Sequence, residues 1–131
     1  MIARLALALL LACAVPASSG ANEAPKAPAT TGRYLTFPGV TASIFRTSQR
    51  RGVLAMDASL NIPDAALRTR ATSLNPRLRA AYAQSLMVYA AGVPPGRPLD
   101  PSYLSHEMQR QTDLVLGKSG AKFLIGSLLV N

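Results

Sequence analysis

The stretch RGVLAMDASLNIPDAALRTR, residues 51–70, decides the fold class of this chain. Every second residue from 54 to 62 is apolar: Leu54, Met56, Ala58, Leu60 and Ile62. More polar residues occupy the positions between them, so the pattern predicts a strand with one face in the core. Pro63 then ends the strand and favours a helix start, and Asp64 puts a negative charge in the first turn. Taken with the strands and the helix predicted on either side of it, this strand and helix lead us to expect an α+β domain.

The helix that follows carries one narrow stripe that extends for about six turns and ends at Gly92. Its members recur at spacings of three and four: Leu67, Ala71, Leu74, Leu78, Ala81, Tyr82, Ser85 and Tyr89. Pro76 interrupts this pattern, and proline inside a helix removes a hydrogen bond. We therefore expect either a kink or a restart, with Asn75 as the cap and Pro76 in the first turn.

Outward from this core, Tyr34–Phe37 and Val40–Phe45 are predicted to be extended, and SQRRG at 48–52 to form a hairpin turn. A second helix is predicted from Asp100 and Pro101 to Gly117. Its buried side comprises Leu104, Met108 and Val115. We thus expect a small antiparallel sheet of three to four strands, packed against a long kinked helix and a shorter second one.

The final segment, KFLIGSLLVN at 122–131, is apolar on both faces. This pattern is typical of a central strand buried on two sides. It also fits a strand whose second face is covered by another subunit.

The first residues, MIARLALALLLACAVPASSGA at 1–21, are typical of a signal peptide. Arg4 precedes an apolar run, and small residues allow cleavage after Ala17 or after Ala21. We therefore expect export to the periplasm. Leu10–Cys13 also approximates a lipobox, so lipidation of Cys13 and attachment to the membrane is the alternative. An uncleaved anchor fits less well, because the apolar run is short for a bilayer.

Residues 22–32 are rich in Ala, Pro and Thr and are predicted to form a flexible linker. Residues 33–131 are long enough for one domain with a modest core. Cys13 is the only cysteine of the chain, so disulfides and thiolate chemistry are not expected in the mature protein.

Positive charge dominates the chain, whose formal net charge is +8. The excess is concentrated between residues 46 and 79, in Arg46, Arg50, Arg51, Arg68, Arg70, Arg77 and Arg79. These arginines are candidates for binding anionic lipid, cell-wall polymer or an acidic partner protein. A merely solvated basic face is the alternative. Nucleic acid is not expected, because export and the small number of aromatic residues argue against it.

No pattern in the sequence predicts a catalytic, metal or cofactor site. His106, the only histidine, should face solvent, and a phosphate-binding glycine loop is missing from the sequence. Asp57 is predicted to pair with Arg46 or Arg51 across the hairpin. Tyr82 and Tyr89 are predicted to be core aromatics whose hydroxyls reach the rim. We therefore expect a protein without enzymatic activity.

The order of these elements resembles the periplasmic domain of the flagellar basal-body-associated FliL family. YLTFP at 34–38 is similar to that family's entry to its first strand, residues 51–86 to its strand-to-helix passage, and residues 122–131 to its final strand. The resemblance implies a non-enzymatic periplasmic protein that forms homo-oligomers and contacts flagellar stator or basal-body proteins. The competing expectation is a basic periplasmic module that binds anionic lipid or cell-wall groups and has no role in motility.

Overall fold

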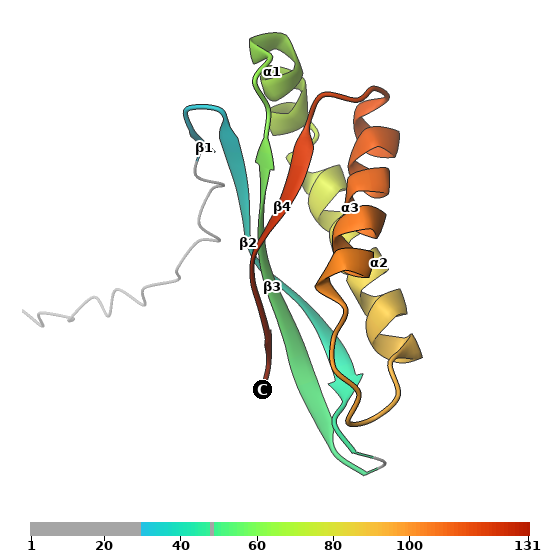
Figure 1. Cartoon of the computed structure of the whole chain (residues 1–131). Coiled ribbons are helices and arrows are strands. Elements are labelled where there is room, and N and C mark those ends of the chain that lie inside the picture. Colours follow the sequence, from blue (N-terminus) through green and yellow to red (C-terminus); the bar gives the residue numbers. More distant parts are fainter. Residues whose placement is uncertain (1–29, 48) are drawn as a thin grey trace, which may run out of the picture.

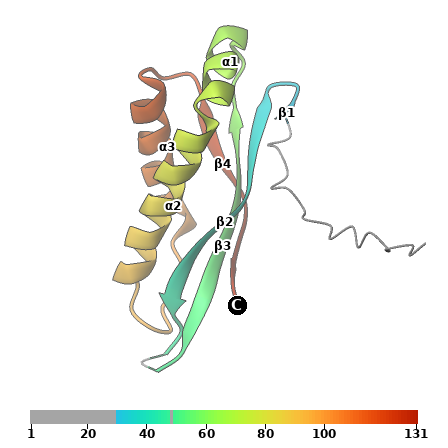
Figure 2. The same cartoon turned by 180° about the vertical axis from the view of Figure 1, so that it is seen from behind.

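The computed structural model describes residues 30–47 and 49–131. It is an α+β domain with a twisted antiparallel sheet on one side and all of its helices on the other (Figures 1 and 2). The elements are β1 (Thr30–Thr31), β2 (Tyr34–Phe45), β3 (Arg51–Asn61), α1 (Ala65–Ser73), α2 (Asn75–Gly92), α3 (Pro101–Leu116) and β4 (Lys122–Val130). Within the described part of the chain, no helix has the length and hydropathy needed to cross a bilayer.

The predicted signal peptide at 1–21 and Cys13 lie outside the described residues, as does most of the predicted linker. The end of that linker belongs to the sheet, however. Thr30 and Thr31 form β1 and pair with Leu35 and Tyr34 of β2. The ordered sheet thus begins before Arg33, the predicted start of the domain.

β2 and β3 form a long antiparallel hairpin, as the alternating pattern predicts. Leu35 lies opposite Leu60, and Ala42 lies opposite Leu54. Facing residues share one side of a sheet, so the apolar positions of both strands meet beneath the helices. All five alternating apolar residues of the 54–62 stretch are buried there.

The two extended segments predicted before the hairpin belong to one strand, β2. The register with β3 shifts between Phe37 and Val40, which marks a bulge at Pro38 and Gly39. Gly39 has a φ of 65°, a conformation that favours glycine. The bulge lets one strand bend without losing its pairing with β3.

β4 lies at the edge of the sheet and pairs with β3 alone, so the predicted central position of this strand is wrong. Phe123 and Ile125 pack against the core. Leu124 pairs with Ser59 on the opposite face, and Leu129 of the same face is largely exposed. Within the described single chain, one apolar face of β4 thus packs against the core and the other is exposed, and cover of the second face by another subunit stays a prediction.

The predicted long helix consists of two helices, α1 and α2, separated at Leu74. The restart alternative is confirmed, with Pro76 in the first turn of α2 and Leu74 in place of Asn75 as the cap. The separation is local, because Leu78 N donates to Leu74 O at 2.9 Å. Asp64 caps α1, since its carboxylate accepts from Leu67 N at 2.9 Å.

α3 begins and ends as predicted. The carboxylate of Asp100 accepts from Tyr103 N at 3.0 Å, and Gly117 ends the helix with a φ of 76°. Leu104 and Met108 are buried, whereas Val115 is half-buried.

Tyr82 of α2 joins the two layers of the domain. Its ring is fully buried and makes edge contacts with Phe37 of β2 and Phe123 of β4, each with 5.1 Å between ring centroids. Its hydroxyl lies 2.6 Å from the Thr112 hydroxyl of α3. Burial raises the pKa of Tyr82 well above its usual value, so the phenol stays neutral and keeps this bond. The prediction of a core aromatic is confirmed, but the predicted position of its hydroxyl at the rim is wrong, because the hydroxyl is buried against Thr112.

Replacement of Tyr82 tests its role in joining the layers. Tyr82→Ala should lower the free energy of unfolding by about 3–5 kcal/mol, because it removes a buried ring. Tyr82→Phe keeps the ring contacts and should cost about 1 kcal/mol. Urea unfolding followed by circular dichroism measures both, and equal losses in the two variants would contradict the role of the ring.

Candidate functional site

No described element covers the face of the sheet turned away from the helices (Figures 1 and 2). It presents four large apolar side chains that are 42–58% exposed: Tyr34, Phe45, Val53 and Leu129. We call this side of the sheet the open face. Phe45, Val53 and Leu129 are neighbours near the hairpin end of this face, whereas Tyr34 lies at the other end of β2. Neighbouring exposed apolar side chains mark a contact site more often than scattered ones do.

Asp57 of β3 lies in the middle of the open face and forms hydrogen bonds to both neighbouring strands, β2 and β4. One carboxylate oxygen accepts from Gly39 N at 2.7 Å, and the other accepts from the Ser127 hydroxyl at 2.9 Å. Gly39 belongs to the bulge of β2, and the register of β4 shifts beside Asp57. The Gly39 N–H, followed by the Ser127 hydroxyl, lowers the pKa of Asp57. The carboxylate thus stabilises two irregular points of the sheet.

The predicted ion pair of Asp57 with Arg46 or Arg51 is wrong. Asp57 lies six positions along β3 from Arg51. A strand rises about 3.3 Å per residue, so the two side chains are roughly 20 Å apart. Arg51 instead lies over the ring of Phe45, with 5.2 Å from its guanidinium carbon to the ring centroid.

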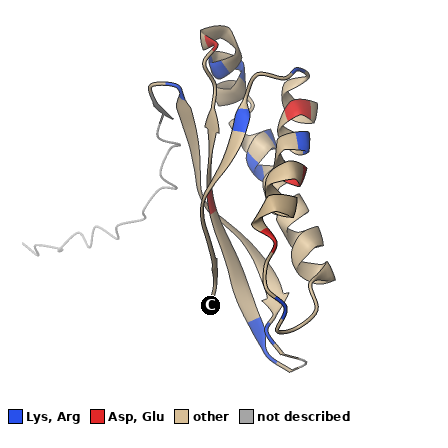
Figure 3. Ribbon diagram, in the orientation of Figure 1, with Lys and Arg blue, Asp and Glu red and all other residues tan. Residues whose placement is uncertain are grey.

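The seven candidate arginines do not form one patch. Arg46, Arg50 and Arg51 lie at the hairpin end of the domain, whereas α1, with Arg68 and Arg70, lies at the opposite end (Figures 1 and 3). Arg77 and Arg79 lie near the start of α2.

Three of the helical arginines bind backbone carbonyl groups of the domain itself. Arg68 donates to Ile62 O at 2.7 Å, where β3 ends. Arg70 donates to Leu116 O at 2.9 Å, at the end of α3. Arg79 donates to Pro38 O at 2.8 Å, at the bulge of β2. These guanidinium groups satisfy carbonyls that the ends of helices and strands leave without a partner.

The hairpin end carries four exposed arginines, Arg46, Arg50, Arg51 and Arg97, which we call the arginine pole. Arg97 comes from the loop between α2 and α3 and was not among the candidates from the sequence. Among the described residues, no guanidinium group of the pole forms an ion pair. The ion pair found in the described part of the chain joins Arg110 and Glu107 on α3, at 2.7 Å.

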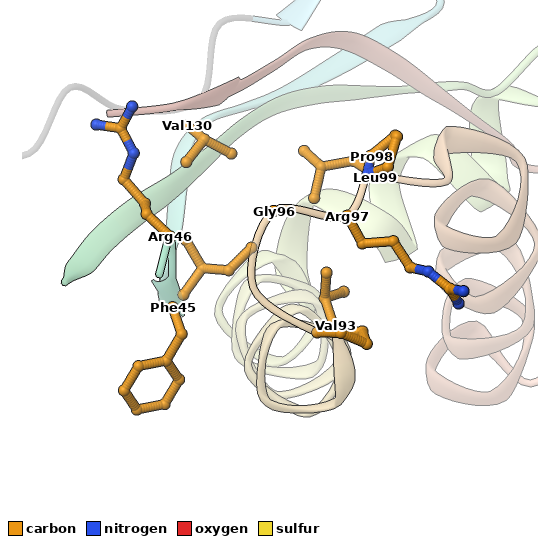
Figure 4. A pocket seen from close by; sticks show the side chains of 10 residues that line it. Phe45, Arg46, Val93, Gly96, Arg97, Pro98, Leu99 and Val130 are labelled. Carbon is orange, nitrogen blue, oxygen red and sulfur yellow. The ribbon is translucent and has the colours of Figure 1, made fainter. Parts of the chain in front are cut away.

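A cavity of about 420 Å³ separates the hairpin from the α2–α3 loop at this pole. Apolar residues make up much of its lining, including Ile44, Leu99 and Val130. Arg46 and Arg97 stand on its two sides, and their guanidinium groups point away from each other (Figure 4). The two cations therefore flank the cavity and do not converge on one ligand atom.

Gly52 sets the position of Arg46. A Cβ atom at Gly52 would lie 2.8 Å from Cδ of Arg46 and 2.5 Å from Asn131 O. Any larger residue would displace either the arginine or the end of the chain. The glycine thus permits the close approach of the hairpin and Asn131, the residue that follows β4.

The outer side of α2 and α3 is apolar in part. Tyr89 and Tyr103 stack at 5.8 Å, and the Tyr89 hydroxyl accepts from Asp100 N at 2.6 Å. This bond agrees with the prediction of a hydroxyl at the rim. His106 is exposed on α3, as predicted. In the described ranges no three His, Cys, Asp or Glu side chains cluster as metal ligands would.

Two residues of these surfaces lacked a usable signal in the sequence. Arg97 lies in a proline-rich loop, and its nearness to Arg46 depends on tertiary packing. Gln109 of α3 binds Phe123 N of β4 and the carbonyl oxygen of Ala121, just before β4 begins. A glutamine on a helix is ordinary in the sequence, and only the position of the sheet edge gives it this role.

No protein-family model matches this chain, and no curated protein matches it.

Asp57 should make the stability of the protein dependent on acid pH. The pKa of Asp57 is lowered in the folded state, so its contribution is present above the unfolded pKa of about 4 and is lost as pH falls through the folded value. Asp57→Asn keeps an acceptor for Gly39 but should flatten the loss of stability below about pH 4. Asp57→Ala should cost about 1 kcal/mol at pH 7.

Urea unfolding between pH 3 and 7 measures both effects of Asp57. Glu107→Gln is a comparison variant, because Glu107 also has a lowered pKa but holds no part of the sheet. If the free energy of unfolding of Asp57→Asn falls with decreasing pH as steeply as that of the unaltered protein, the proposed role of this carboxylate is refuted.

Proposed function

We propose that this protein is an exported, non-catalytic accessory protein of a bacterial envelope machine and that it acts by self-association and protein contacts. The open face of the sheet is the observation that supports the proposal. Its four exposed apolar side chains lie on regular strands, where the backbone is already ordered. A partner that covers this face buries apolar area without an entropic cost for ordering the backbone.

The flagellar basal body is the machine that we propose. The resemblance of residues 34–38, 51–86 and 122–131 to the FliL family supports this choice. On this proposal the partners are further copies of the chain and proteins of the stator or basal body, and the protein works in the periplasm.

Self-association should depend on the open face. Size-exclusion chromatography with light scattering should show an oligomer whose fraction rises with protein concentration. Replacement of Leu129 by Thr should raise its dissociation constant about tenfold or more, because an exposed apolar side chain of each copy leaves the contact. Val88→Thr on α2 is the matched control, since Val88 is 64% exposed on the helical side. A monomer at every concentration would contradict the proposal.

The flagellar assignment has a separate test. Deletion of the gene in a flagellated host should reduce swimming in soft agar, and a plasmid copy should restore it. Normal swimming of the deletion strain would refute the flagellar role and leave the test of self-association unaffected.

We propose as a second candidate a module that binds anionic lipid or cell-wall groups, because the arginine pole supports it. The four guanidinium groups have no carboxylate partner among the described residues, so their charge is not neutralised within the domain. Figure 3 shows basic segments at the hairpin end, where the strands meet the turn. Each arginine near an anionic surface contributes about 1 kcal/mol of attraction.

Binding to phosphatidylglycerol vesicles tests this second candidate. Replacement of Arg46, Arg50 and Arg51 by Gln should weaken binding at least about tenfold and reduce its dependence on salt. The control replaces Arg33, Arg77 and Lys122 by Gln, which removes the same charge away from the pole. Equal losses in the two variants, or binding that salt does not affect, would contradict a site at the pole.

A further inference from the structure

The outer edge of β4 has backbone groups that point away from the sheet. Val53 and Asn131 exchange both backbone hydrogen bonds, each at 3.0 Å. In an antiparallel pair such exchanges occur at every second residue, so Leu129 bonds to Ala55 in the same way. Leu128 and Val130 lie between these positions. Their N–H and C=O groups therefore point outward, away from β3.

The first part of this edge is protected by α3. The side-chain oxygen of Gln109 accepts from Phe123 N at 2.8 Å, and its side-chain nitrogen donates to Ala121 O at 2.7 Å. The amide thus forms the two bonds that a neighbouring strand would form. Another strand cannot pair there without displacing Gln109.

The last part of the edge lacks such protection. In the part of the chain that the structure describes, no hydrogen bond from another element reaches the outward groups of Leu128 and Val130. No charged side chain follows Lys122 on β4, although charged residues commonly protect edge strands. The bulge next to Asp57 separates this part from the protected one. Residues 127–131 thus form a short, uncharged edge that is open to pairing.

We propose that a second copy of this chain pairs with this edge, with β4 antiparallel to β4 about a two-fold axis at Leu129. This inference rests on the proposed self-association and specifies its contact. In this register Leu128 of each copy lies opposite Val130 of the other, so all outward backbone groups of these residues find partners. The two sheets become one continuous sheet, and the helices of both copies lie on the same side.

A second copy fits this edge better than a charged partner does. The chain carries a net charge of +8 and attracts acidic proteins in general, but residues 123–131 contain no cation to meet an acid. Strand-to-strand pairing about a two-fold axis is self-complementary, since the same surface is used twice. Leu129 of each copy then contacts the other on the open face, where it is 58% exposed in the single chain.

Disulfide cross-linking tests the register directly. In the paired strands Leu129 lies opposite its own copy at a non-hydrogen-bonded position, where Cα atoms are about 4.5 Å apart. Leu129→Cys, in the full chain with Cys13→Ser, should therefore form a disulfide-linked dimer under mild oxidation. Val53→Cys is the matched control, exposed on the same face but one strand inward. Its two copies are three strand spacings apart and offset by four residues along the strands, which separates them by about 20 Å.

A proline at the edge provides a second test that needs no new thiol. Val130→Pro removes an outward N–H that makes no bond to β3, so the domain should stay folded by circular dichroism. The dissociation constant of the oligomer should rise about tenfold or more, whereas Val130→Thr, which keeps the N–H, should change it less than about threefold.

The outcomes separate this inference from the proposed function. Cross-linking at Leu129→Cys but not at Val53→Cys, together with loss of association in Val130→Pro, supports the edge pairing. An oligomer that cross-links equally through both cysteines, or that Val130→Pro leaves intact, overturns the edge pairing and keeps self-association. A protein that is monomeric at every concentration, with no cross-link at Leu129→Cys, overturns both.

Discussion

The burial of Tyr82 between Phe37 and Phe123 is the contact on which the rest of the domain depends. One ring of α2 touches both outer long strands of the sheet, and its hydroxyl binds Thr112 of α3. Sheet and helices are therefore held together from the inside. The described helices leave the other side of the sheet without a cover.

Two polar side chains, Asp57 and Gln109, stabilise the irregular points of the sheet and part of its edge. Asp57 holds the bulge of β2 and the irregular point of β4 from the open face, and Gln109 protects the start of β4 from the helical side. Among the described residues, an apolar face and a short strand edge remain without a cover, and we propose that these surfaces contact other macromolecules.

The positive charge of the chain has two different uses in this fold. Arg68, Arg70 and Arg79 donate to backbone carbonyls at the ends or bulges of helices and strands, so these guanidinium groups stabilise the fold. The arginine pole has no such bonds from its guanidinium groups within the described residues, and its charge is directed to solvent. A count of arginines along the sequence cannot separate these groups, because each depends on which distant carbonyl comes within reach.

The sequence by itself determined the features that depend on neighbouring residues. These are the buried face of β3, the caps at Asp64 and Asp100, the restart of the helix at Pro76, and the end of α3 at Gly117. Tertiary structure alone decided that β4 is an edge strand, that Asp57 binds Gly39 and Ser127 rather than an arginine, and that Gln109 protects β4. The physical reason is that periodicity and capping act over a few residues, whereas strand order and hydrogen bonds between elements depend on which distant segments the core brings together.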